Sequence, residues 1–175
     1  ARENFDQFIN SGYDAMFLSG NNMWWQIRYE NNGNDLVCYA DYDLDPIEDL
    51  SLKTINWHNP LLGYSITSSV GSDFANGGYG LRYADNGWDG YKIILPNSPI
   101  FQGLNLEYGQ IISIPSAEYD SAPVLFTSIN EVPQFSEDLF HKFNLIGFDK
   151  AFRPVGEFQK YGTFIIMQKT EQSGI

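Results

Sequence analysis

The alternation of apolar and polar positions divides the chain into short segments, and a clearly apolar one lies near its start. Residues 13–19 (YDAMFLS) are mostly apolar and end at Gly20, which is the pattern of a short buried strand. Gly20 can turn the backbone, and Asn21 and Asn22 can cap a short helical turn after it. We therefore predict that residues 13–19 form the central strand of a sheet, followed by a sharp turn.

The next segment has the residue types of a β-hairpin. Two β-prone runs flank the sequence NNGN at residues 31–34, and Asn and Gly tolerate the positive φ angles that tight turns require. A cross-strand ion pair between Arg28 and Glu30 would order such a hairpin. We predict a hairpin over residues 25–40.

The remaining elements are indicated by shorter patterns. Residues 2–10 place Phe5, Phe8 and Ile9 on one face, which predicts an amphipathic helix that ends at Ser11-Gly12. Further β-prone runs predict strands over residues 61–67, 91–95, 111–114, 122–126, 143–148 and 163–167.

Three stretches are predicted to be turns or short helical segments. Residues 71–90 are rich in Gly, Asn and Asp, which favours tight turns between short strands. Ser98-Pro99 has the pattern of a helix start, with Ser as the cap and Pro as the first residue. We expect a helical turn at residues 135–142.

An acidic loop at residues 40–50 invites comparison with a calcium site. Asp41, Asp43 and Asp45 alternate as calcium ligands do, but Pro46 stands where an EF-hand needs Gly. Leu52 stands where that motif needs a bidentate Glu. A solvated acidic turn is the stronger interpretation.

Composition and charge exclude several classes of partner. The chain has 175 residues, of which 43% are hydrophobic, and a net charge of −12. This length predicts one domain over residues 1–175, and the charge would repel nucleic acid and anionic membranes. No run is long and apolar enough to span a bilayer. The single cysteine, Cys38, excludes an internal disulfide, and we expect a cytoplasmic protein.

The start of the chain suggests that more polypeptide precedes it. The sequence has no initiator Met and opens on what reads as the tail of a helix. We expect a portion of a longer polypeptide, whose remainder would be one partner of this chain.

The order of several motifs points to a family. FLSGNNMWWQIRYE is followed by LVCYADYDLDP, INWH, SPIFQGLNLEYGQ, AEYD and GTFIIMQKTEQSG. Together they resemble the C-terminal part of the N,N-dimethylformamidase large-subunit family, over nearly the whole chain. This resemblance implies an α/β fold of the glutamine-amidotransferase-like (flavodoxin-like) kind, with a strand-rich mixed sheet. The chain would be the second half of that domain.

The same resemblance implies an iron centre, held in the characterised amidase by two tyrosines and a glutamate. One of those tyrosines aligns with Trp24, and indole has no lone pair for a metal. The glutamate aligns with Glu118, and the other tyrosine would lie upstream. We therefore expect no metal at residues 21–30 and no cofactor held by this chain alone.

Two functions remain open on these residues. The first is hydrolysis of a small polar or amide ligand, with Glu118 and Asn22 as the catalytic residues and Asn22 donating to a developing oxyanion. The second is a non-catalytic binding or structural module that keeps the fold without the metal. In either case the predicted ligand-binding residues are Asn21, Trp24, Trp25, Arg28 and Asp120.

These residues are expected to meet at one place. Glu118 and Asp120 point to the same side if their stretch is extended, and a turn after a strand can present Asn22 and a Trp from the 24–25 pair. We predict one shared concave pocket lined by Asn22, Glu118 and that Trp.

Overall fold

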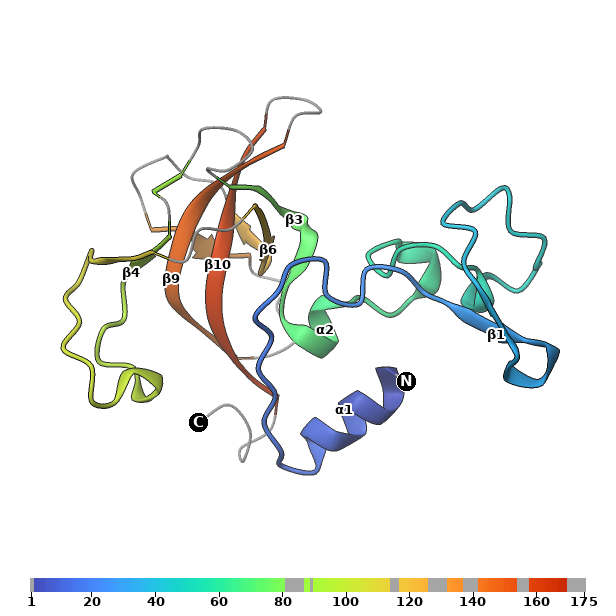
Figure 1. Ribbon diagram of the computed structural model, residues 1–175, viewed down its shortest axis with the longest axis horizontal. Coiled ribbons are helices and arrows are strands. Elements are labelled where there is room, and N and C mark those ends of the chain that lie inside the picture. Colours follow the sequence, from blue (N-terminus) through green and yellow to red (C-terminus); the bar gives the residue numbers. More distant parts are fainter. Residues whose placement is uncertain are drawn as a thin grey trace.

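The computed structural model describes residues 2–80, 87–88, 90–113, 117–125, 132–136, 142–153 and 158–169. Figure 1 shows a sheet built around two long strands, β9 and β10, with helix α1 beside it and a long arm that carries β1. Among the described residues, no helix is long and apolar enough to cross a membrane.

The main sheet has six strands, and β9 is its central one. β10 pairs with β9 along one edge, while β4 and β3 pair with successive parts of the other edge. β5 extends the sheet beyond β4, and β6 extends it beyond β3. The strands of the sheet are β3 Asp73–Tyr79, β4 Tyr91–Ile93, β5 Ile111–Ile112, β6 Glu118–Ser121, β9 Lys142–Arg153 and β10 Phe158–Gln168. A separate pair consists of β7 Val124–Leu125 and β8 Gln134–Phe135.

The long β9–β10 pair supplies most of the core. Ile146 and Phe148 on β9 are fully buried, and so is Tyr161 on β10. The rings of Phe148 and Tyr161 meet edge to face with centroids 5.5 Å apart, an arrangement that aromatic pairs favour. The strands predicted at 143–148 and 163–167 are thus confirmed and are longer than predicted.

Two glycines let β6 approach its neighbours closely. A Cβ added at Gly77 on β3 would lie 1.9 Å from the carbonyl oxygen of Tyr119 on β6. A Cβ added at Gly162 on β10 would lie 2.3 Å from the Tyr119 ring. The Ala122 N–H donates a 2.8 Å hydrogen bond to Oγ1 of Thr163, so β6 is held against both β3 and β10.

Helix α1, Arg2–Asn10, confirms the predicted N-terminal helix, and Gly12 follows it with a φ of 90°. Arg2 anchors this helix to α2, Thr67–Val70. Its Nε donates to Oγ of Ser69 at 2.7 Å, and its guanidinium lies over the rings of Trp57 and Tyr64. Burial lowers the pKa of Arg2 to about 10, and the nearby charge of Asp6 opposes this shift.

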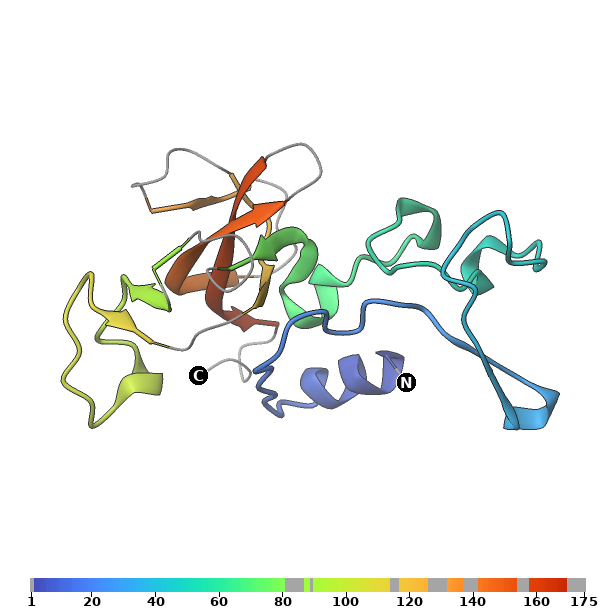
Figure 2. The same cartoon turned by 45° about the horizontal axis from the view of Figure 1, so that its top comes forward.

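The arm, which we define as residues 25–54, extends away from the sheet in both views (Figures 1 and 2). It contains the antiparallel pair β1 Arg28–Glu30 and β2 Asp35–Val37, joined by a turn at Asn31–Gly33. Asn31, Asn32 and Gly33 all have positive φ, as the sequence predicted, and the hairpin is confirmed. A short 3₁₀ helix at Leu50–Leu52 closes the arm, and another at Pro60–Leu62 follows it.

The predicted central strand at residues 13–19 is wrong. These residues belong to no strand, and Met16 and Leu18 are 79% and 87% exposed. They link α1 to the turn at residues 20–23 (Figure 1). The central position belongs to β9, whose length lets it pair with three other strands, and an apolar run alone does not reveal which segment has such partners.

Other local predictions have mixed outcomes. Residues 61–67 contain the end of a 3₁₀ helix and the start of α2 instead of a strand. Pro60 opens this 3₁₀ helix, and Oδ1 of Asn59 caps it by accepting from the Leu61 N–H. Residues 73–79 form β3 instead of tight turns, and the predicted helical turn at 135–142 lies mostly outside the described residues. Strands at 91–93 and 111–112 and a 3₁₀ helix at Pro99–Phe101 confirm the predictions there.

The fold class is strand-rich with few helices, which is compatible with the predicted α/β class. Every pairing between the described strands is antiparallel. The glutamine-amidotransferase-like arrangement stays a prediction, as does the single domain over residues 1–175.

Candidate functional site

The turn at residues 20–23 packs directly on β6. Asn21 and Met23 have φ angles of 54° and 49°, a conformation that Asn adopts more easily than most residues. A Cβ at Gly20 would lie 3.3 Å from the carbonyl oxygen of Glu118. The glycine therefore lets the turn and the strand approach each other, although no helical turn follows it.

Asp120 holds this turn in place. One carboxylate oxygen accepts a 2.8 Å hydrogen bond from the Asn21 N–H, and the other accepts 3.1 Å bonds from the N–H and Nδ2 of Asn22. The side chain is 8% exposed, and a buried carboxylate needs such donors. Asp120 thus fixes the conformation of residues that lie 98 and 99 positions earlier in the chain.

Glu118 lies two residues before Asp120 on the same strand and reaches the same turn. Its Oε2 accepts a 2.6 Å hydrogen bond from Nδ2 of Asn21. The prediction that Glu118 and Asp120 point to one side is confirmed, because successive odd or even positions of a strand share a face. Asn21, Asn22, Glu118 and Asp120 are therefore brought together, while their use in binding a ligand stays a prediction.

The two Asn22 groups that could act on a ligand are engaged within the turn. Nδ2 of Asn22 donates to the carbonyl of Ser19 and to Asp120, and its Oδ1 accepts from Oγ of Ser19. In this conformation Asn22 stabilises the turn, and donation to an oxyanion would require its amide to be released.

Trp24 leads from the turn to a second group of side chains. Its ring lies 4.9 Å from the imidazole of His58 and 5.8 Å from the ring of Phe74, measured between centroids. Trp25 meets Trp24 edge to face at 6.0 Å and is 38% exposed. Trp25 also forms an antiparallel bridge with Asn56, which brings His58 beside the turn.

Asp73, at the start of β3, is the residue that the sequence analysis missed. It is 3% exposed, and its Oδ1 accepts a 2.8 Å bond from the Ala75 N–H. Its other oxygen accepts no hydrogen bond from any residue that the structure describes. Burial raises the pKa of Asp73, the charge of Asp120 raises it further, and the charges of His58 and Arg153 lower it.

His58 packs on Trp24 and lies near enough to Asp73 for its charge to lower the pKa of that carboxyl. It is exposed, and its imidazole makes no hydrogen bond within the described part of the chain. Since the charge of His58 acts on the pKa of Asp73, the two groups form a candidate acid–base pair beside the Trp24 ring.

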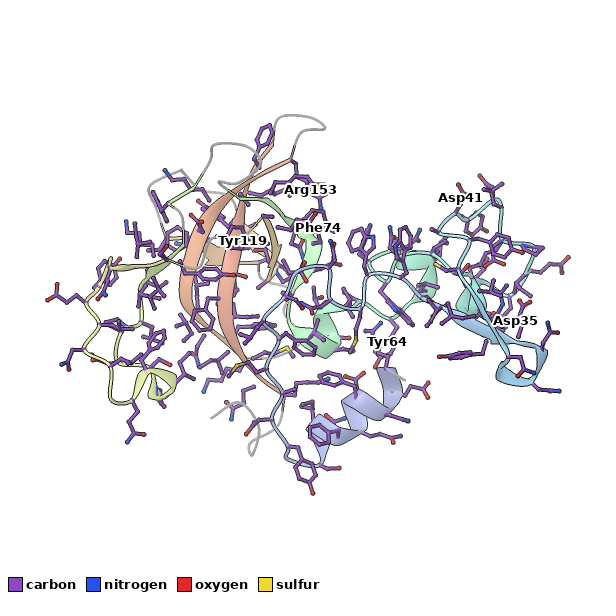
Figure 3. The ribbon with its side chains drawn as sticks, in the orientation of Figure 1. Asp35, Asp41, Tyr64, Phe74, Tyr119 and Arg153 are labelled. Carbon is purple, nitrogen blue, oxygen red and sulfur yellow. The ribbon has the colours of Figure 1, made fainter. Side chains whose placement is uncertain are left out.

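The charge of Arg153 also acts on Asp73 and lowers the pKa of its carboxyl. Its guanidinium lies 4.4 Å from the Phe74 ring centroid and donates to the carbonyls of Phe74 and Gly77. Figure 3 shows Arg153 and Phe74 side by side near the start of β3. Arg153 thus places a positive charge near Asp73 while its own donors are bound to backbone.

Arg28, predicted to bind ligand, lies on the arm. Its guanidinium binds Asp45 at 3.0 Å and Glu30 at 2.8 Å. The predicted pair with Glu30 exists, but both residues belong to β1, so the contact runs along the strand and does not cross the hairpin. Asp45 is buried beside this guanidinium, so it departs from the solvated acidic turn predicted for residues 40–50. That this loop does not bind calcium stays a prediction.

The donors at the turn do not fit an iron ion. Trp24 offers only an indole, Glu118 is bound to Asn21, and both oxygens of Asp120 are bound to the turn. No group of three His, Cys, Asp or Glu side chains among the described residues could hold a metal. The expectation that residues 21–30 hold no metal stays a prediction.

The comparisons with known proteins identify a family. Residues 1–144 match the family described as N,N-dimethylformamidase beta subunit-like, C-terminal, which confirms the resemblance seen in the sequence. No curated protein and no solved structure matches the chain.

Proposed function

Since the chain belongs to the N,N-dimethylformamidase beta subunit-like, C-terminal family, we propose that it carries part of a hydrolase site for small amides. One observation supports this most directly. The exposed, unbonded imidazole of His58 lies beside buried Asp73 and against Trp24, next to the turn that binds Glu118. In this proposal His58, Asp73 and Glu118 are the acid–base groups of the site.

The proposed reaction adds water across the C–N bond. His58 takes a proton from water, the oxygen attacks the amide carbon, and the C–N bond breaks as the amine leaves with the proton from His58. The carboxylate of Asp73 stabilises the positive imidazolium formed in between. Glu118 accepts a hydrogen bond from the N–H of substrates that have one, such as formamide, and the Trp24 and Trp25 rings form an apolar wall.

Family membership supports two further proposals. The first proposal is that the described strands belong to a glutamine-amidotransferase-like fold, in which further strands would pair with them. The rest of a longer polypeptide would complete the site beside residues 20–24.

Turnover by the full chain tests the proposal. Release of amine from formamide and from N,N-dimethylformamide should fall by roughly 10²–10⁴ in His58→Gln, the range for loss of a general base. Glu118→Gln should also lower the rate, whereas Glu107→Gln should not, because Glu107 is exposed and lies outside the site. Full activity in His58→Gln would refute the role of His58.

The second candidate is a non-catalytic module, and one observation favours it. The backbone N–H and Nδ2 of Asn22 both donate hydrogen bonds to Asp120, so these two side chains stabilise the fold. If the folded full chain hydrolyses neither amide, this second function is supported and the hydrolase proposal fails.

A further inference from the structure

The arm at residues 25–54 has a polar interior. Its buried residues are Gln26, Asp45, Lys53 and Thr54, each at most 9% exposed. Oδ2 of Asp45 accepts from the backbone and hydroxyl of Thr54, and Nζ of Lys53 donates to the carbonyl of Asp45. Nε2 of Gln26 donates to the carbonyl of Lys53 at 2.9 Å. Hydrogen bonds and an ion pair therefore hold the arm together without an apolar core.

The apolar side chains of the arm point outward instead. None of them is buried, and Leu44, Tyr29 and Leu36 are 68%, 65% and 58% exposed. The other exposed large apolar residues of the arm are Trp25, Ile27, Tyr39, Tyr42, Leu50 and Leu52. Single exposed apolar residues are ordinary, but the arm carries nine large ones and no apolar core.

The charges on the outside of the arm all have one sign. Its two cations, Arg28 and Lys53, are bound inside it to Asp45. Asp35 and Asp41 are labelled on the arm in Figure 3, where both lie far from the sheet. The exposed acidic residues of the arm are Glu30, Asp35, Asp41, Asp43, Glu48 and Asp49.

We propose that the arm docks on a basic protein surface, one that presents an apolar strip flanked by Lys and Arg side chains. Apolar contact supplies the binding free energy, and charge complementarity selects the partner. Nucleic acid and anionic lipid have the same sign of charge as the arm and are disfavoured. A second copy of this chain is disfavoured for the same reason, because each copy carries a net charge of −12.

A synthetic peptide that alternates lysine with leucine and valine is the probe. Fluorescence anisotropy should show saturable binding to the full chain that weakens as salt is added. Polylysine and an equivalent glutamate peptide should bind far more weakly. No saturable binding would overturn the proposal, because the arm would then have no docking surface. Equal binding of polylysine would also overturn it, because charge alone would then explain the binding.

Exposed leucines provide the matched variants. The double variant Leu36→Ser and Leu44→Ser should weaken peptide binding by at least about tenfold, since each leucine loses apolar contact. Leu104→Ser should leave it unchanged, because Leu104 is 59% exposed but lies outside the arm. Both variants should keep the melting temperature of the wild type.

An equal loss in Leu104→Ser would overturn the proposal, because binding would then not depend on the arm. Sedimentation tests whether a second copy of the chain binds the arm, and vesicle binding tests whether anionic lipid does. Self-association, or binding to anionic vesicles, that is lost in the leucine double variant would also overturn it.

Discussion

Four buried carboxylates among the described residues differ in the groups that donate hydrogen bonds to them: Asp45, Asp73, Asp120 and Asp149. Asp120 is bound by the turn at residues 21–22, and Asp45 by Arg28 and Thr54. Asp149 is fully buried and accepts bonds from the N–H groups of Trp88 and Lys150 and from the hydroxyl of Tyr119. Asp73 has one oxygen without a partner among the described residues. This difference makes Asp73 the carboxylate that is most available for chemistry.

Asp45 should make the arm sensitive to acid. Its hydrogen bonds with Arg28 hold its pKa well below the ordinary value of 3.8. Below pH 3.8 the unfolded chain therefore takes up a proton before the folded one does, and the stability that Asp45 contributes is lost as the pH falls. Amide exchange at Thr54, whose N–H donates to Asp45, should accelerate in this range.

Two variants separate this effect from general acid unfolding. Asp45→Asn should show fast exchange at Thr54 already at neutral pH. Asp43→Asn, which changes an exposed carboxylate on the same loop, should behave like the wild type. Slow exchange at Thr54 in Asp45→Asn would mean that the ion pair does not hold the arm.

Asp73 should have the opposite effect on stability. Burial raises its pKa above 3.8, so the unfolded chain ionises first as the pH rises and the folded state loses stability. Asp73→Asn should therefore melt at a higher temperature than the wild type at neutral pH, and this advantage should vanish near pH 3.5. A variant less stable than the wild type at neutral pH alone would show that the surroundings stabilise the Asp73 charge, contrary to this prediction.

At the scale of elements, close backbone contacts control the sheet. Gly77 lets β3 meet the carbonyl of Tyr119 on β6, and the glycine-rich run that contains it therefore forms a strand. Such a contact depends on a residue far away in the sequence. Local patterns cannot reveal it.

Gly77→Ala should destabilise the fold by about 1–3 kcal/mol or more, because its Cβ would overlap a backbone atom. Gly103→Ala is the control. Its added Cβ would meet no atom within 4 Å, so its only cost is that alanine must adopt the positive φ of +86°. Denaturant unfolding of both variants compares the two effects. Equal losses would show that β3 can move away from β6.

Elements specified by neighbouring residues were predictable from the sequence. The hairpin at 28–37 follows from Asn and Gly in its turn, and the helix at 2–10 from its apolar face. The position of residues 13–19 was not predictable, because strand pairing decides it. At the site, the shared side of Glu118 and Asp120 follows from strand alternation, but the proximity that lets the charge of His58 act on Asp73 depends on how distant segments pack.

At the scale of the molecule, one polar cluster joins both ends of the described chain. Asp6 on α1 accepts from Oγ of Ser69 at 2.9 Å and pairs with Nζ of Lys169 at 2.5 Å. Ser69 in turn accepts from Arg2. Helix α1, α2 and the end of β10 are thereby linked.

Asp6→Ala should destabilise the protein by about 1–3 kcal/mol, the range for leaving buried donors without a partner. The side chain of Lys169 is 6% exposed, and that of Asp6 is 14% exposed. Glu3→Ala removes an exposed carboxylate from the same helix and should change the stability little. Thermal unfolding of both variants gives the comparison, and equal melting temperatures would contradict the linking role.

The clamp between Asp120 and the turn at residues 21–22 also sets an order of events during biosynthesis. The Asn21 N–H can form its hydrogen bond only after Asp120, which lies 99 residues later, has been synthesised. At 5–20 residues per second, synthesis of that stretch takes about 5–20 seconds. During this interval the turn at residues 21–22 lacks the carboxylate that accepts its N–H groups. In a nascent chain halted before Asp120 the Asn21 amide should therefore exchange fast, and in one extended past β6 it should be protected.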